Sequence, residues 1–408
     1  MNRLFSTRPI TSAEQTSWYS SIDKAERLVC AKSQTPVTIS PIEILETPLG
    51  PIKHIVRCHL KSSPNSNSVI VKDISRRDSQ PFDPLTTDRF SASYRFFSDC
   101  ACLQFLSTDL EVRSCPNLVA FDKDVGLLVL EDLGDEMSVL AALSGQSSEG
   151  AKTELRRLAE SLAEIQGRSI GREEEYRNFR EGLGPGYEQV SVQDRRFMEK
   201  ELPAVWSICD QLGLDVKQAQ QDVERVLEAL SDPGEYLALL HRDVIPPNFL
   251  SVENRLCVFD FEFAGYGHGL VDIAQVRMGF PTYGLPAMIP KSVVRATEQI
   301  YQERFTFYSE LKVLRHPFEK ALTEATCFWA LFELVGSLQT AMDEMHDQSV
   351  QRCIRLRARL KAFSELSNEV GHLEHMATLS MAITEQIGIR RKVSEELAEF
   401  PAFSQQLH

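Results

Sequence analysis

The hydrophobic pattern of this chain changes character near residue 132, and that change limits what the chain can fold into. From about residue 42 to 131, short β-rich runs are separated by Pro, Gly, Ser and Asn, a pattern typical of an antiparallel sheet. One helix-like stretch, Thr87 to Leu106, interrupts them. Beyond Asp135 apolar residues recur mostly at helical spacing. The sequence therefore predicts an α+β fold, with a sheet first and a larger, mostly helical part after it.

The chain divides into three predicted segments. We expect an N-terminal extension over residues 1–40, a sheet domain over 41–133 and a helical domain over 134–408. The helical domain contains three short predicted strands, of which the last two form a hairpin: Tyr236 to Leu240, Phe249 to Val252 and Leu256 to Phe259. A chain of 408 residues with 43% apolar residues is long enough to bury a substantial core.

Charge and cysteine content exclude several classes of partner. The net charge of −14 argues against binding to nucleic acid or to an anionic membrane surface. Nine scattered cysteines form no disulfide framework, and a secretory signal and an apolar membrane span are both missing from the pattern. We therefore expect a cytoplasmic protein with neither a nucleic-acid nor a membrane partner, and the oligomeric state stays open.

One constellation of polar residues points to chemistry. Asp243 and Asn248 bracket a loop of four residues, short enough for both side chains to face one point. The predicted hairpin then returns the chain and delivers Asp260 beside them. A carboxylate that can accept a hydroxyl proton, together with an amide oxygen and a second carboxylate for a divalent cation, suits phosphoryl transfer. Oxygen-only ligands favour Mg²⁺ over zinc.

Isolated aspartates on loops are usually turn or cap residues, so single positions carry little weight. The joint spacing is more specific: His-x-Asp at His241, an Asn five residues after Asp243, and Asp-Phe-Glu at the end of a predicted strand. The combination favours one shared active site, or a degenerate version of it.

These motifs resemble those of the aminoglycoside phosphotransferase and choline kinase superfamily. Its signature is similar to His-Gly-Asp-x-x-x-x-Asn followed by Asp-Phe-Glu and a later Asp, and the resemblance covers roughly residues 40 to 340. Protein kinases carry Asp-Phe-Gly and then Ala-Pro-Glu, which is missing here. The resemblance implies a two-lobed protein-kinase-like fold that binds ATP, with GTP as an alternative, and Mg²⁺ under the sheet lobe.

The resemblance also implies roles for individual residues of the helical lobe. Asp243 would be the catalytic base, Asn248 and Asp260 the magnesium ligands, and His241 a structural residue that holds the loop.

Three further residues of this region receive lesser roles. Glu262 is a secondary candidate for the metal or substrate side, and Asp272 would order the catalytic loop from behind. His268 has no cofactor partner, which favours packing or capping.

In the sheet lobe, the resemblance assigns a lysine and an acid to the nucleotide. Lys72 follows three apolar residues on a predicted strand and would grip the α- and β-phosphates. Asp99 aligns with the family's glutamate, which would pair with that lysine. Because Asp is one methylene shorter than Glu, we expect the pair to be longer, water-bridged or formed only when the lobes close.

The rest of the predicted nucleotide site is weaker. A phosphate-covering loop between Glu46 and His54 contains one glycine, Gly50, which is a thin signal for backbone contact with phosphate. The residues expected to contact adenine through their backbone, on the strand that joins the lobes, are Leu130, Glu131 and Asp132.

The leading hypothesis is an ATP-dependent O-phosphotransferase that acts on the hydroxyl of a small molecule, of antibiotic, amino alcohol or sugar type. The acidic charge slightly favours a cationic acceptor. The alternative is a pseudokinase-like binding module of the same fold, favoured by the thin glycine loop and by Asp99. A Ser/Thr protein kinase, suggested by Arg242 in His-Arg-Asp, and a metal-dependent hydrolase are more distant alternatives.

Overall fold

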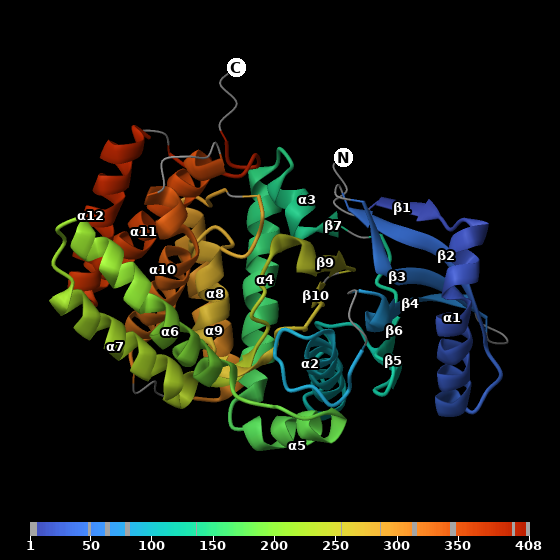
Figure 1. Ribbon diagram of the computed structural model, residues 1–408. Helices are drawn as coiled ribbons and strands as arrows, with labels where there is room; N and C mark the ends of the chain where they lie inside the picture. The colour runs from blue at the N-terminus through green and yellow to red at the C-terminus, as the bar shows by residue number, and fades with distance from the viewer. Residues whose placement is uncertain are drawn as a thin grey trace. The chain divides into compact units, whose positions relative to one another are not determined.

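The computed structural model describes residues 6–47, 50–61, 66–77, 82–135, 137–253, 255–285, 287–311, 316–342, 348–393 and 396–404. The chain forms two compact units. Unit 1 comprises Met1–Gly145, Arg172–Tyr187 and Pro247–Ala264, and unit 2 comprises Gln146–Gly171, Glu188–Pro246 and Gly265–His408. An antiparallel sheet dominates unit 1 and helices dominate unit 2, which confirms the predicted α+β class (Figure 1).

The main sheet of unit 1 has six antiparallel strands in the order β1-β2-β3-β4-β6-β5. Their bounds are Ser6–Pro9, Thr38–Thr47, Gly50–Lys61, Ser66–Asp73, Leu118–Asp122 and Leu127–Glu131 for β1 to β6. The five β-rich runs of the sequence correspond to β2 to β6. They form strands because β-branched residues alternate there with residues of the opposite face, and turn residues separate the runs.

Side-chain alternation divides this sheet into two faces, each covered by a helix. Val69 and Val71 of β4 pack with the residues of α1 (Ser12–Ser33). Leu128 of β6 packs with Phe96 and Cys100 of α2 (Ala92–Gln104) on the other face. Since successive residues of a strand point to opposite faces, the strand places the side chain that follows Val71 on the α2 face.

The N-terminal segment contains two elements that the sequence analysis did not predict. Strand β1 pairs with β2, and α1 buries Trp18 and Ile22 against the sheet. A capping box begins α1, in which Thr11 and Glu14 each bond the other's backbone N–H. The segment that forms α1 is rich in Ser and Thr and has a narrow apolar face, so its sequence shows little helical periodicity.

Unit 1 also contains a second, smaller sheet, two more α-helices and a π-helical turn. The predicted hairpin is confirmed, with β9 (Phe249–Val252) antiparallel to β10 (Arg255–Val258), and Asn254 of its turn lies outside the described residues. Strand β7 (Met137–Ser138) adds to β9. The helices are α3 (Val139–Leu143) and α5 (Glu173–Leu183), and a π-helical turn, Phe105–Asp109, extends α2.

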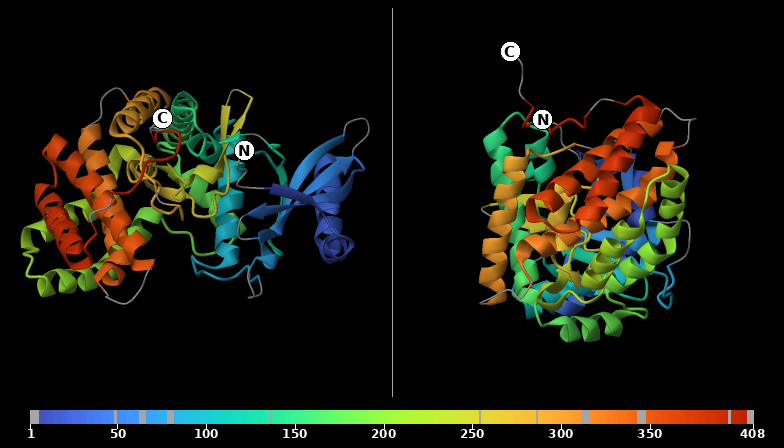
Figure 2. Two further views of the ribbon diagram at one scale, coloured as in Figure 1. Left: turned by 90° about the horizontal axis from the view of Figure 1, so that it is seen from above. Right: turned by 90° about the vertical axis from the view of Figure 1, so that its left-hand side faces the viewer.

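Unit 2 is built from helices around a two-stranded ribbon. The helices α4 and α6 to α12 span Ser148–Ser169, Val190–Gln211, Lys217–Ser231, Leu270–Arg277, Lys291–Ser309, Phe318–Met342, Gln348–Val370 and Glu374–Arg391. Helix α10 contacts α6, α7, α8, α11 and α12, and α4 packs along α9 (Figure 2). Of the described residues, α10 alone is long and apolar enough to cross a membrane, and 83% of that stretch is buried.

The ribbon of unit 2 pairs β8 (Leu237–Leu240) with β11 (Gly265–His268). The sequence predicts β8 but not β11, because two of the four residues of β11 are glycines, which are depleted in strands. A Cβ at Gly267 would lie 2.8 Å from Leu240 Cδ1, so a larger residue there would force the Leu240 side chain to shift. The nine cysteines are all free, and eight of them are buried.

Two glycines two residues apart test the packing of unit 1. A Cβ at Gly184 would lie 2.2 Å from the Phe97 ring, whereas a Cβ at Gly182 would meet nothing within 4 Å. Gly184→Ala should lower the free energy of unfolding by about 1–3 kcal/mol through overpacking. Gly182→Ala, inside α5, should change it by no more than ~1 kcal/mol, in the stabilising direction. Urea unfolding of both variants measures the difference, and equal stabilities would contradict the packing.

Candidate functional site

Lys72 lies at the centre of a buried ion cluster in unit 1. It is the residue after Val71 on β4, so strand alternation points it toward α2. Its Nζ lies 2.8 Å from Asp99 Oδ2 and 2.6 Å from Asp260 Oδ1. The side chains of Lys72 and Asp99 are 6% and 2% exposed, and that of Asp260 is 35% exposed. Three predicted site residues from separate segments therefore meet at one ammonium group.

The contact between Asp99 and Lys72 is direct, which overturns the expectation of a longer or water-bridged pair. The other carboxylate oxygen of Asp99 also has a partner, because the N–H of Phe261, directly after Asp260, donates to Asp99 Oδ1 at 3.1 Å. One buried carboxylate thus holds both the lysine and the loop that bears Asp260.

Lys72 carries its positive charge firmly. Burial alone would lower the pKa of its ammonium group, but the carboxylates of Asp260 and Asp99 outweigh burial and raise that pKa well above its ordinary value. A permanently charged lysine is suited to a polyanionic ligand such as phosphate.

Asp260 and Asn248 supply oxygen atoms from the same unit. Asp260 has φ of 68°, a left-handed conformation that is unusual for a non-glycine residue. Asn248 is 5% exposed. Its backbone carbonyl oxygen accepts from the N–H of Phe259 at 3.2 Å, which ties the start of β9 to the end of β10. No group of three or more His, Cys, Asp or Glu side chains within the described ranges could hold a metal by itself.

Glu262 has partners that the sequence did not reveal. Arg77 donates to both of its carboxylate oxygens, and Arg95 Nη1 lies 3.9 Å away. Burial, and next the charge of Asp260, raises the pKa of Glu262. The guanidinium of Arg95 also lies over the ring of Phe263, 5.0 Å from its centroid. No local pattern could predict these contacts, because Arg77 and Glu262 are 185 residues apart.

The other predicted nucleotide-binding residues of unit 1 are not joined to this cluster by a described contact. Gly50 begins β3 and pairs with Thr47, while residues 48 and 49 of the predicted phosphate loop lie outside the described residues. Leu130 and Glu131 belong to β6, where the Glu131 N–H donates to Asn117 O at 2.9 Å. Asp132 forms an ion pair with Arg57 at 2.8 Å. The adenine contact stays a prediction.

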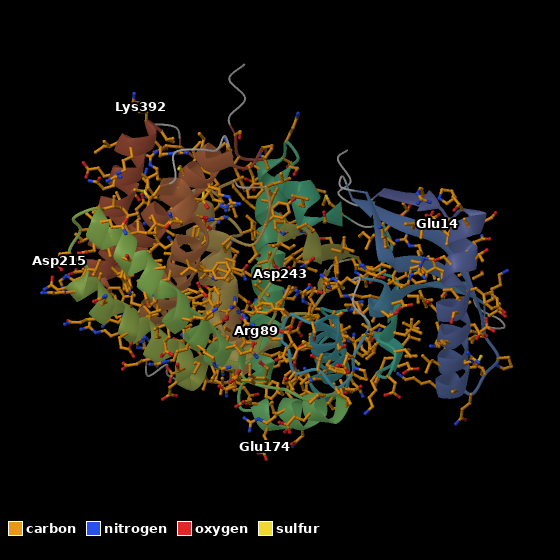
Figure 3. The ribbon with its side chains drawn as sticks, in the orientation of Figure 1. Glu14, Arg89, Glu174, Asp215, Asp243 and Lys392 are labelled. Atoms are coloured by element: carbon orange, nitrogen blue, oxygen red, sulfur yellow. The ribbon has the colours of Figure 1, made fainter. Side chains whose placement is uncertain are left out.

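Unit 2 contains Asp243, on the loop after β8 (Figure 3). Asp243 and Arg242 are partly exposed, and the residues that flank this pair, His241 and Val244, are buried. The N–H of Asp243 donates to His241 Nδ1 at 3.3 Å. His241 therefore braces the loop through its backbone.

Asp272, fully buried at the start of α8, anchors the same loop. It accepts from the backbone N–H of His241 at 2.7 Å and of Arg242 at 2.9 Å, and from Gln166 Nε2 at 2.9 Å. Burial raises the pKa of Asp272, and the charges and N–H groups of residues 241 and 242 oppose that rise. Gln166, whose side-chain oxygen accepts from Tyr301 at 2.5 Å, was not predicted.

His268 lies in the core of unit 2 and packs by stacking. Its ring stacks on Tyr236 with centroids 5.6 Å apart. Burial lowers the pKa of His268 to about 4, so the ring is neutral at physiological pH. The favoured packing role fits this environment.

The chain is similar in sequence and in fold to known proteins. The sequence profile of the phosphotransferase enzyme family matches residues 88–302, more than half of the 408 residues. The chain belongs to the phosphotransferase enzyme family. The match includes Asp99 and the segment from Asp243 to Asp272 and begins after Lys72, which the ion cluster brings to the site.

Individual relatives are more distant. An N-acetylmuramate/N-acetylglucosamine kinase of Neisseria meningitidis serogroup B is 32% identical over 172 residues, 41% of this chain and 46% of that protein. The match thus spans about half the length of that kinase. Choline kinase LicA from Streptococcus pneumoniae has a TM-score of 0.43 at 15% identity, over 87% of this chain and 100% of that one. Macrolide 2'-phosphotransferase MphH from Brachybacterium faecium has a TM-score of 0.43 at 13% identity, over 82% and 98%.

Asp99 holds both Lys72 and the backbone of Phe261, so replacing it should affect both. Asp99→Asn should lower turnover about 10- to 100-fold, because the neutral side chain orients both Lys72 and the Phe261 backbone less firmly. Asp99→Glu should also lower turnover, because the longer side chain has no room where the Asp99 side chain is only 2% exposed. Steady-state kinetics of both variants measure this. Wild-type turnover in Asp99→Asn would show that the cluster does not serve catalysis.

Proposed function

We propose that the chain is an ATP-dependent O-phosphotransferase that transfers the γ-phosphate to the hydroxyl of a small molecule. The observation that carries the proposal is the buried cluster of Lys72, Asp99 and Asp260, with contacts of 2.8 and 2.6 Å. Burying three charged groups is costly unless they are paired, and the arrangement leaves one partly exposed carboxylate edge at Asp260. Membership of the phosphotransferase enzyme family supports the same activity.

The nucleotide's phosphates would bind at Lys72. Its ammonium group is a fixed positive charge held by two carboxylates, so its position is set before any ligand arrives. The nearby cations Arg77 and Arg95 face a single carboxylate, Glu262, and their excess positive charge only offsets the excess negative charge of Lys72 with its two carboxylates. Neutralising a triphosphate therefore requires further positive charge.

The chemistry of the available donors fits Mg²⁺. Asn248 and Asp260 offer an amide oxygen and a carboxylate, and Mg²⁺ characteristically takes one or two carboxylates together with substrate phosphates. When bound, Mg²⁺ would offset phosphate charge as the γ-phosphoryl group is transferred. Glu262 is a weaker candidate ligand because Arg77 engages both of its oxygens.

Asp243 is proposed as the base that accepts the proton of the acceptor hydroxyl. Its partial exposure keeps the carboxylate accessible, while Asp272 holds the backbone just before it and His241 holds its own N–H. A base acts efficiently only when it is held within hydrogen-bond reach of the reacting group.

Sugars are the acceptor class that we favour. The support is the match to a kinase of N-acetylmuramate and N-acetylglucosamine, which overlaps this chain over 172 residues. Amino alcohols and cationic antibiotics are the competing classes, and the acidic net charge of −14 is compatible with them.

Nucleotide binding can be tested without knowing the acceptor. A ligand at ~100 times its Kd adds about 2.7 kcal/mol to the free energy of unfolding. MgATP should therefore raise the Tm more than ATP alone, and Asp260→Asn should abolish the magnesium-dependent part. Asp124→Asn, an exposed aspartate of the same unit, is the matched control. No shift of wild type with MgATP or MgGTP at millimolar concentration would favour the pseudokinase-like alternative.

Catalysis is tested at Asp243. With N-acetylglucosamine, N-acetylmuramate, choline, ethanolamine and aminoglycosides as acceptors, nucleotide consumption and the mass of the product identify the substrate. Asp243→Asn should then lower kcat about 10²- to 10⁴-fold, with little change in the KM for ATP, because Asn keeps the shape but not the basicity. The exposed Asp215→Asn serves as control (Figure 3). Turnover above about a tenth of wild type would rule out Asp243 as base.

A further inference from the structure

Arg242, between His241 and the proposed base, has a backbone conformation that its own side chain disfavours. Its φ is 74°, in the left-handed region that glycine adopts readily and other residues rarely do. Such a conformation persists in a non-glycine residue only where the surroundings hold it, and it is concentrated at functional sites. Contacts of both its backbone and its side chain hold Arg242 in this conformation.

The backbone of Arg242 is bonded on both sides by α8. Its N–H donates to Asp272 Oδ1 at 2.9 Å, and its carbonyl oxygen accepts from Gln275 Nε2 at 3.5 Å. Asp272 and Gln275 are both fully buried, so these contacts are shielded from water.

The side chain of Arg242 is held by two other helices of the same unit. Its guanidinium forms an ion pair with Asp194 of α6, where the two side chains are 11% and 5% exposed. The guanidinium carbon also lies over the rings of Phe328 and Trp329 of α10, 5.1 and 5.3 Å from their centroids. Such stacking uses the planar guanidinium, which lysine lacks.

The aromatic partner is itself tied to the helix that anchors the loop. Trp329 Nε1 donates to the carbonyl of Val271 at 2.7 Å, and Val271 immediately precedes Asp272. The helices α6, α8 and α10 therefore converge on one residue. Because φ and ψ of Arg242 set the direction of the next residue, these contacts fix the direction in which Asp243 leaves the loop.

We propose that Arg242 is a positioning residue, clamped by Asp194 and Trp329, that holds the Asp243 carboxylate in its productive direction. The inference rests on the proposed function for its catalytic consequence and on the geometry of unit 2 for the clamp itself.

The decisive variant is the double substitution Arg242→Gly with Asp194→Asn. Glycine accepts the left-handed backbone, and Asn avoids leaving a buried carboxylate without its cation. The fold should survive while the clamp is lost. We expect kcat to fall about 10- to 100-fold with KM for nucleotide and acceptor within about twofold of wild type. The single variant Arg242→Lys should keep part of the kcat that the double variant loses, because lysine keeps the positive charge. It should not keep all of it, because lysine cannot form the planar stack on the aromatic rings.

Arg196→Gln provides a matched control, since Arg196 lies on the same helix as Asp194 with a side chain that is 67% exposed. It should leave kcat unchanged. The proposal is overturned if the double variant keeps kcat within about twofold of wild type, or if its loss of activity disappears when rates are divided by the folded fraction.

Hydrogen exchange separates failure of the clamp from failure of the proposed function. Amides of residues 241–244 should exchange at least about 10-fold faster in the double variant than in wild type, with amides of unit 1 unchanged. This comparison needs no substrate, so it decides the clamp even if no acceptor of the panel is phosphorylated. Unchanged exchange at residues 241–244 would overturn the proposal.

Discussion

The interaction on which the sheet-bearing part of the site depends is the buried ammonium of Lys72 with its two carboxylates. A lone buried charge is very unfavourable, so a strand can carry Lys72 on an inner face only if other segments bring acids to it. Asp99 comes from the helix that covers that face, and Asp260 comes from the loop after β10. Each of the three segments is thus constrained by the other two, and removing one carboxylate would loosen more than one contact.

Unit 2 uses a related device without a buried cation. Asp272 is a buried carboxylate that accepts two consecutive backbone N–H groups and one side-chain N–H, which stabilise its negative charge. Asp99 does the same for the N–H of Phe261. In both units a buried acid therefore fixes the backbone beside an aspartate that is proposed to be functional, and neither acid is the group proposed to meet the substrate.

Sequence patterns predicted the parts of this arrangement that depend on local order. A β-rich run located β4 with Lys72, and the spacing from His241 to Asp272 located the polar loop. The family resemblance also paired Lys72 with Asp99, although the shorter Asp side chain led us to expect a longer, water-bridged or closure-dependent pair. Pairs such as Arg77 with Glu262 and Arg242 with Asp194 could not be predicted, because their members are far apart in the sequence and belong to no periodic pattern. Helix α1 follows from no clear periodic pattern: Thr11-Ser12-Ala13-Glu14 carries a capping signal, but the apolar stripe behind it is narrow.

Both aspartates proposed to act on substrate or metal depend on a left-handed backbone: Asp260 itself at φ of 68°, and Asp243 through Arg242 at φ of 74°. A left-handed conformation costs a non-glycine residue about 1–2 kcal/mol, so the surrounding contacts must exceed that amount. At Asp260 the contact is the Lys72 ion pair, and at Arg242 it is the set formed with Asp194, Asp272 and Trp329. A backbone held against its own preference by several buried partners has few alternative positions. Groups held in this way need little reorganisation when charge moves during phosphoryl transfer, and that is the condition under which fixed charges and bases contribute most to catalysis.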